Sequence, residues 1–479
     1  MVSAGLLDLV AHGVQDIYLI GNPQMTYFKA VYKRHTNFTM ESIRTVFEGN
    51  ADFGNKVVCK IPRNGDLIHT MVLEVDLPEL TATGSDSQHS IRYISNIGYS
   101  MIDYCDLRIG AQLIDRQYGE WMQIWADLTY DDEKKQAFDQ MIKTDAQNGP
   151  MTVYIPFQFW FCRHIASSLP LCALLYHEVE LDIYLRPLSQ LYSFGDIHYY
   201  NLVYLGNPAP GQYQYQKTTG VLFTSDITGK ELKYDAGSGS GSGTATITYD
   251  SPDTIILDTL LTGAQLTKVY IQPTYTITGT PRILDTRLYV DYIYLDTYER
   301  KYFAQSQHRY LIEQVQYNDE ESITANTLSK KITVDFNLPV KELYWVCQTN
   351  ENYNHNLLSN FTNSPDQYYQ LPSDFIDTFT ILYNGNERFQ PRSGEYFRLI
   401  QPFQKHTNIP YQRFIYSYSL ALTPEELQPS GASNYSKIDT VDFYMNMRAG
   451  NPTCNMRIYG INYNILRIMQ GMGGVAFST

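Results

Sequence analysis

Few side chains in this sequence stand in arrangements that could perform chemistry. The first candidate is the pair His177 and Glu178, because a carboxylate beside an imidazole can orient it as a general base. The residues that follow alternate between apolar and polar, as they do in a β-strand. Adjacent side chains on a strand face opposite sides of the sheet, so a structural histidine is the stronger interpretation.

The histidines and the acidic clusters also lack the spacing that metal or acid–base catalysis needs. None of the ten histidines belongs to an HxH or HExxH motif. The run Asp131-Asp132-Glu133 precedes Lys134 and Lys135, and such a mixed run is more typical of a solvated helix surface than of paired catalytic carboxylates. We therefore predict that the chain is not an enzyme and has no catalytic residue, no metal and no cofactor.

A small cluster of basic and aromatic residues lies near the N-terminus. Its members are Lys29, Lys33, Arg34 and His35 with Tyr27, Phe28 and Tyr32. Such a mixture can bind single-stranded nucleic acid. The net charge of the chain is −14, however, and an acidic chain gains little from the release of counterions by phosphates. Contacts with other proteins are the favoured interpretation, and no specific nucleic acid partner is predicted.

Three short motifs could accept N-linked glycans. They begin at Asn37, Asn360 and Asn434, and each has Ser or Thr two residues later. The motif is common by chance. Asn360 is the best placed of the three, because it lies in a polar stretch that resembles a loop.

The elements that would position these residues are mostly strands. Apolar and polar residues alternate over 70–77, 179–185 and 331–338, which indicates sheets with one face in a core. Asn384-Gly385 lies between two strand-like runs and predicts a tight hairpin, because both turn positions accept a positive φ. The sequence is therefore typical of an all-β protein.

One clear helix interrupts the strands. From Asp115 onward, Tyr118, Trp121, Trp125 and Leu128 recur at helical spacing. The pattern resumes around Phe138 after the acidic break at 131–133. A second, short helix is predicted over residues 3–12.

Two turn-rich stretches divide the chain. The sequence GNPAPG at 206–211 predicts a domain boundary. The Gly/Ser run at 237–243 lies between KELKYD and TATITYD and predicts a flexible loop that joins two strands. A phosphate-binding loop would need a helix with a lysine after the run, and the sequence has none there.

Composition sets further limits. The chain has 479 residues, which exceeds the size of a single core, so two domains are expected. Tyr occurs 41 times and charged residues make up only 18% of the chain, which suits both sheets and subunit interfaces.

Six scattered cysteines without a CxxC pair favour a reducing compartment. Neither a signal peptide nor an apolar run of 18 residues is expected. Many strands in two halves indicate two jelly-roll sandwiches.

Five separated blocks of sequence resemble the major capsid proteins of nucleocytoplasmic large DNA viruses. They are LVAHGVQDIYLIGNPQMTYFKAVYKRHTNFT (9–39), EWMQIWADLT (120–129), YIPFQFWFCRHIASSLPLCALLYHEVELDI (154–183), DYIYLDTYERKYFAQSQHRYLIEQVQ (291–316), and a long C-terminal block that begins at NGNERFQPRSGEYFRLIQPFQKHTNIP (384–410) and ends in RIYGINYNILRIMQGMGGVAFS (457–478). The blocks span residues 9 to 478 in the order typical of that family.

The resemblance implies a double jelly roll of two tandem eight-stranded antiparallel rolls. It divides the chain into an N-terminal arm (1–24), a first jelly roll (25–212) and a second (213–479). It also implies a homotrimeric capsomer with a pseudo-hexagonal outline that tiles an icosahedral shell over an internal membrane. The expected partners are further copies of the chain, neighbouring capsomers, and minor capsid and penton proteins that contact the arm. The expected location is the virion, with assembly in the host cytoplasm.

Two alternatives stay open at this point. The chain could be a minor capsid paralogue or an assembly scaffold, because the matching blocks do not distinguish these roles. It could also be a carbohydrate-binding jelly-roll protein, which would be a monomer with a ligand pocket.

Overall fold

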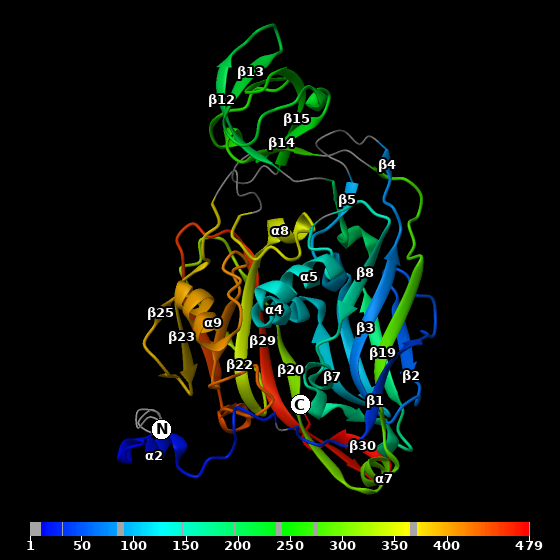
Figure 1. Ribbon diagram of the computed structural model, residues 1–479. Helices are drawn as coiled ribbons and strands as arrows, with labels where there is room; N and C mark the ends of the chain where they lie inside the picture. The colour runs from blue at the N-terminus through cyan, green and yellow to red at the C-terminus, as the bar shows by residue number, and fades with distance from the viewer. Residues whose placement is uncertain are drawn as a thin grey trace, which may run out of the picture.

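A computed structural model describes residues 11–478 except 31, 84–90, 146, 195–197, 236–241, 273–275 and 365–370. Two β-sandwiches stand side by side, and a small green barrel lies beyond one end of them (Figure 1). The N-terminal segment runs along the opposite end, which separates the barrel from the chain's beginning.

The first sandwich pairs a five-stranded sheet with a four-stranded sheet. One sheet has the order β1 (Phe38–Thr45), β19 (Asp285–Leu295), β3 (Leu67–Leu77) and β8 (Met151–Pro156), and β9 (Leu169–Pro170) adds to β3. The other has the order β2 (Lys56–Ile61), β10 (Val179–Leu185), β6 (Ile102–Ile109) and β7 (Gln112–Tyr118). Two short ladders join β5 (Ile91–Tyr93) to β11 (Tyr192–Phe194) and β4 (Ala82–Thr83) to β18 (Thr276–Ile277).

The second sandwich repeats this plan. One sheet has the order β20 (His308–Ile323), β29 (Cys454–Met469), β22 (Pro339–Thr349) and β26 (Tyr416–Ser419), with β27 (Ser433–Asn434) and β30 (Met472–Val475) at its margins. The other has the order β21 (Ser329–Thr333), β28 (Val441–Met447), β23 (Ile376–Tyr383) and β24 (Asn386–Glu387), with β25 (Arg392–Ser393) beside β23.

Both sandwiches have the same strand order. When the eight main strands of each are counted along the chain, the sheets read 1-8-3-6 and 2-7-4-5 in both. All the pairings are antiparallel. This interleaving of early and late strands defines a jelly roll. The predicted double jelly roll is therefore confirmed.

The alternating patterns locate the buried faces correctly. In β3 the predicted inward residues Met71, Leu73 and Val75 are buried and their neighbours are half-buried. Burial also alternates over 331–338, but β21 ends at Thr333 and is followed by one further backbone bond to β28, from the Val334 N–H to the Val441 carbonyl. There the N–H groups of Asp335 and Asn337 donate to side-chain oxygens of the neighbouring strand β20 instead of to a ladder.

The turn and the helices follow the sequence with one correction. Asn384 and Gly385 both have positive φ and connect β23 to β24, as predicted. The helix α4 spans Gly119–Thr129 and starts after Tyr118, because the residues from Gln112 onward pair with β6 as strand β7. Beyond the acidic break, α5 (Asp132–Ile142) is a separate helix, and the Asp131 carboxylate accepts a hydrogen bond from the Lys134 N–H to cap it.

The remaining helices are short. They are α2 (Ile17–Ile20), α3 (Ile97–Ser100), α6 (Trp160–Arg163), α7 (Thr297–Gln305), α8 (Asn350–Asn354) and α9 (Gln401–Lys405), and α9 continues a π-helical turn at Tyr396–Ile400. The helix predicted over 3–12 lies almost wholly outside the described residues, which begin at position 11.

The predicted boundary at 212/213 is wrong. The closed barrel consists of β12 (Tyr199–Gly206), β13 (Tyr213–Thr219), β16 (Thr254–Leu257), β15 (Ser242–Ser251), β14 (Glu231–Asp235) and β17 (Val269–Gln272). After the barrel, β19 returns to the first roll and pairs with both β1 and β3. The turn at 206–211 is thus a hairpin within an inserted domain, and the first roll ends near Leu295.

Two further sequence predictions can be placed. The Gly/Ser run follows β14 and leads into β15, which are paired strands, although residues 236–241 of the loop are outside the described chain. The arm extends past its predicted end at residue 24, because the first strand begins only at Phe38 and the described residues before it are almost all exposed.

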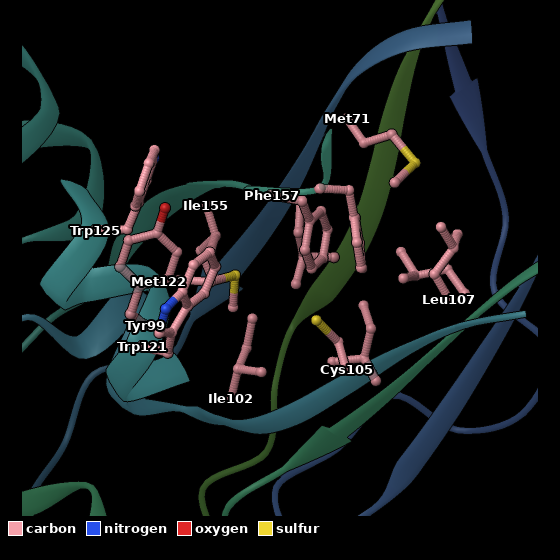
Figure 2. Packing of buried hydrophobic residues seen from close by; sticks show 14 of the residues in the cluster. Met71, Tyr99, Ile102, Cys105, Leu107, Trp121, Met122, Trp125, Ile155 and Phe157 are labelled. Carbon is pink, nitrogen blue, oxygen red and sulfur yellow. The ribbon is translucent and has the colours of Figure 1, made fainter. Parts of the chain in front are cut away.

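Three hydrophobic cores hold the molecule together. The barrel and the second roll each have their own. The third core fills the first roll, where Trp121 and Met122 of α4 pack near Ile102 and Phe157 (Figure 2). It continues into the second roll, because it includes Ile312 and other side chains from the near sheet of that roll. The two rolls therefore share a core, whereas the barrel does not.

Candidate functional site

Buried apolar side chains, ion pairs and hydrogen bonds join the two rolls, and α4 lies at the centre of this junction. Every residue of α4 from Trp121 to Leu128 is buried, including the polar Gln123 and Asp127. Trp121 and Trp125 stack with their ring centroids 5.9 Å apart. A helix that is buried on all sides is typical of an internal element rather than a surface cover.

An ion pair fixes the start of α4 to the second roll. The guanidinium of Arg457 on β29 donates to both carboxylate oxygens of Glu120, at 2.8 and 2.6 Å. The Tyr459 hydroxyl donates to the same carboxylate at 2.9 Å. Such a bidentate pair fixes orientation as well as distance.

A buried carboxylate joins β7 to β20. Asp115 accepts hydrogen bonds from the Val315 N–H, at 3.0 Å, and from the Gln117 side chain, at 2.9 Å. Burial raises the pKa of Asp115 to about 6. A titratable carboxyl group is thus buried in the contact between the two rolls.

A second group of buried charges lies against the ring of Trp125. Glu313 on β20 bonds to Lys341 of β22 and, at 2.8 Å, to Arg163 of α6 in the first roll. The Arg163 guanidinium lies over the Trp125 ring, 4.6 Å from its centroid. Burial alone would raise the pKa of Glu313, but the two cations hold it below its ordinary value.

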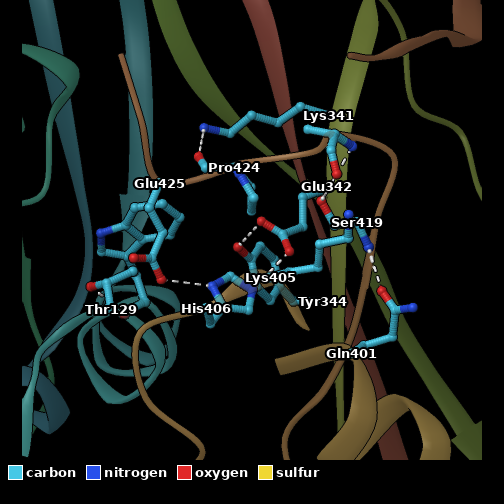
Figure 3. A network of polar contacts seen from close by, with 12 residues as sticks. Thr129, Lys341, Glu342, Tyr344, Gln401, Lys405, His406, Ser419, Pro424 and Glu425 are labelled. Atoms are coloured by element: carbon cyan, nitrogen blue, oxygen red, sulfur yellow. Dashed lines mark hydrogen bonds and ion pairs between the residues drawn. The ribbon is translucent and has the colours of Figure 1, made fainter. Parts of the chain in front are cut away.

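His406 belongs to a neighbouring network (Figure 3). Its side chain is fully buried and bonds to Glu342 at 2.8 Å and to Glu425 at 3.0 Å. Burial alone would lower the pKa of His406, but the two carboxylates raise it to about 9. The next residues reach the first roll, where Asn408 donates to the backbone oxygens of Leu128 and Asp127.

The junction contains the functional residues that sequence reasoning missed. Glu120 lies inside a recognised block, but no local pattern pairs it with Arg457, which is more than 300 positions away along the chain. The buried polar residues of α4 carried a weak signal, because Gln123 and Asp127 interrupt an otherwise apolar helix.

The residues weighed for chemistry have structural places. The ring of His177 bonds to the backbone of Gly473 at 3.0 Å, and no bond to Glu178 is formed. Asp132 and Glu133 lie exposed in the first turn of α5, where carboxylates favour the helix dipole. Within the described residues, no group of three or more His, Cys, Asp or Glu side chains could hold a metal ion.

The three glycosylation motifs differ in accessibility. Asn37 and Asn434 are exposed. Asn360 is half-buried: its amide donates to the Ser364 carbonyl, and its oxygen accepts from Thr362. The structure therefore favours Asn37 and Asn434 as acceptors, and glycosylation stays a prediction.

The basic and aromatic cluster lies in the exposed arm rather than at the start of the first roll. Phe28 is 98% exposed, and Tyr27 and Tyr32 are about as open. Large apolar side chains held this far into water mark a contact surface. In the described part of the chain, no helix has the length and apolarity to cross a membrane.

The barrel rests on the second roll through few contacts. Lys268 pairs with Glu351 of α8 at 2.5 Å, and the Tyr199 hydroxyl bonds to His355 at 3.1 Å. Tyr270 meets the His355 ring edge-on. We call these five residues the barrel seat.

Solved structures that are similar to this chain include viral capsid proteins. The chain aligns with the capsid protein of PBCV-1 over 95% of its own length and 100% of that chain, with 27% identity and a TM-score of 0.67. The Faustovirus major capsid protein aligns over 96% of this chain and 94% of its own, with a TM-score of 0.67 but only 12% identity, which supports the fold alone. The chain is thus a double jelly-roll capsid protein.

Sequence comparisons narrow the class. Residues 26–203 match the profile described as major capsid protein N-terminus, and residues 299–474 match that of the large eukaryotic DNA virus major capsid protein. The major capsid proteins of Pyramimonas orientalis virus and Paramecium bursaria Chlorella virus 1 are 34% and 31% identical, each over 100% of both chains. The chain belongs to the major capsid protein family of large eukaryotic DNA viruses. Most of the barrel lies between the two matched stretches.

Proposed function

We propose that three copies of this chain form a capsomer with a pseudo-hexagonal outline that tiles an icosahedral shell over an internal membrane. The observation that carries this proposal is the identical strand order of the two rolls. Two similar rolls per chain turn threefold symmetry into six similar edges, and closed symmetry then produces one repeating block. The rigid junction keeps the two rolls at a fixed angle, as such tiling needs.

The role is structural, without a catalytic step and without a specific nucleic acid. The exposed arm is the surface for minor capsid and penton proteins, and its apolar side chains supply the buried area that such a contact needs. Assembly takes place in the host cytoplasm and ends in the virion.

Electron microscopy of the purified protein tests the capsomer. We expect a threefold particle with a hexagonal outline. A chain that stays a monomer at micromolar concentration in sedimentation would overturn the proposal. The abundance of the chain in purified virions separates the major role, which predicts a dominant component, from that of a minor paralogue, which predicts a trace.

A further inference from the structure

A cavity of about 680 Å³ opens between the two rolls, beside the Arg457–Glu120 pair. Strands β6, β7 and β10, helix α4 and the chain after β10 line one side. Strands β20 and β29 and helix α8 line the other. Its size lies within the range of about 300–1,000 Å³ that is usual for small-molecule sites, which often form between domains.

Tyrosine rings make up much of its walls and are held in place by one another. Tyr104 and Tyr184 stack 4.2 Å apart on one side. Across the cavity, Tyr317 of β20 lies 4.8 Å from Tyr118 of β7 and 5.2 Å from Tyr459 of β29. The rings form a fixed surface with both apolar and hydroxyl character.

The charged groups of the cavity compensate one another. Arg457 pairs with Glu120, Arg186 pairs with Asp103 at 3.3 Å, and Arg116 pairs with the buried Asp106 at 2.6 Å. Glu320 also lines the cavity and shares Arg457 with Glu120, at 3.6 Å. Among the described residues, the cavity therefore offers no free cation to an anionic ligand, but it presents many hydrogen-bonding groups that are already oriented.

Gln123 supplies an independent indication of a ligand. Its side chain is only 4% exposed and lines the cavity. The amide nitrogen donates to Asp127 at 2.9 Å, while the amide oxygen has no protein partner. A buried acceptor without a donor is unfavourable, and because this oxygen is almost closed to water, the Gln123 side chain must turn toward the cavity to accept from a hydroxyl or N–H of a bound molecule.

We propose that this cavity binds a short, neutral oligosaccharide. Such a molecule carries hydroxyl groups around its edge for the Gln, Arg, Glu and Tyr side chains, and C–H faces for the rings. It brings no charge that would need a partner. An extended peptide fits less well, because it needs backbone partners such as a free strand edge, whereas polar side chains supply the hydrogen-bonding groups described above.

Saturation-transfer NMR on the full-length protein, in the assembly state in which it is purified, tests this proposal. The probes are maltotriose, cellotriose and chitotriose, with 3′-sialyllactose as the charged comparison. We expect at least one neutral trisaccharide to bind and the charged one to bind more weakly. Q123M should weaken binding about three- to tenfold through the loss of one hydrogen bond.

Y353A and Y444A complete the test. Tyr353 lines the cavity and is 46% exposed, whereas Tyr444 is 38% exposed and lies outside it. Y353A should weaken binding without lowering the unfolding temperature, and Y444A should leave binding unchanged. The proposal fails if no neutral trisaccharide binds, or if Q123M and Y353A bind as the unchanged protein does. It also fails if hydrogen exchange shows that another protein chain fills the cavity.

Discussion

The junction of the two rolls and the barrel seat are both contacts between domains of one chain, yet they are built differently. The junction shares a hydrophobic core and buries the charges of Glu313, Lys341 and Arg163 within it. The seat joins the barrel to the second roll through the Lys268–Glu351 ion pair, with Lys268 43% exposed, the Tyr199–His355 hydrogen bond and the edge-on contact of Tyr270 with His355.

This difference separates a rigid body from an attached module. Two rolls that share a core are expected to unfold together, because neither can open without exposing apolar surface of the other. The barrel has a separate core and a closed sheet, so it can move or unfold while the rolls stay intact. The following predictions test that separation.

Removing the buried carboxylate should have the largest effect. E313A leaves Lys341 and Arg163 buried without their anion, and we expect a loss of about 3–5 kcal/mol in the free energy of unfolding of both rolls. E321A is the matched control on the same strand, because Glu321 forms an exposed pair with Lys330 at 3.2 Å. The control should cost under about 1 kcal/mol in urea denaturation. Equal effects would contradict the assigned role of the junction.

The pH dependence of stability should depend on His406. Its pKa is about 9 in the folded chain against an ordinary 6.5, so the stabilisation is complete below pH 6.5 and is lost as the pH rises through 9. The loss should be on the order of 3 kcal/mol. Urea midpoints measured from pH 6 to 10 should fall steeply for the unchanged protein and much less for H406Q.

D115N should stabilise the junction at neutral and higher pH. The folded pKa of Asp115 is about 6, above the ordinary 3.8, so the folded chain loses stability as the pH rises from 3.8, and the penalty is complete above pH 6. Asparagine carries no charge and removes this penalty. Its amide can also donate to the side-chain oxygen of Gln117, which has no hydrogen-bond partner in the unchanged protein. We expect a gain of about 3 kcal/mol at pH 8 and under about 1 kcal/mol at pH 4. A variant that is less stable at both pH values would contradict this account.

The barrel seat should contribute least. K268A removes one partly exposed ion pair, and such pairs contribute under about 1 kcal/mol. The unfolding temperature of the rolls should therefore change by less than the error of its measurement. Hydrogen exchange should nevertheless become faster in β14 and β17. A large drop in the stability of the rolls would show that the barrel is integral to them.

The sequence predicted those elements whose signal is local. Alternation placed the buried face of β3, and Asn384-Gly385 placed a hairpin, because both depend on neighbouring residues. The start of α4 was wrong because residues 112–118 suit either a helix or a strand, and pairing with β6 decides between them. The boundary failed because the return of β19 depends on partners in β1 and β3, far away along the chain.

The junction could be predicted only in part. The block around α4 pointed to a region of importance, but ion pairs such as Arg457 with Glu120 arise from the packing of the two rolls. The raised pKa of Asp115 comes from burial and that of His406 from two neighbouring carboxylates, and a single sequence records neither environment.

The late position of β19 determines the order in which a ribosome can deliver a finished first roll. Ile43 of β1 pairs with Val290 of β19, and Leu73 of β3 pairs with Leu288 of β19. Until β19 is synthesised, after the whole barrel, the nascent chain has a gap between β1 and β3. Such open strand edges invite pairing with other chains. The strands of the barrel are close together in sequence, so the barrel can fold first. It then forms a compact unit next to the gap between β1 and β3 until β19 is synthesised.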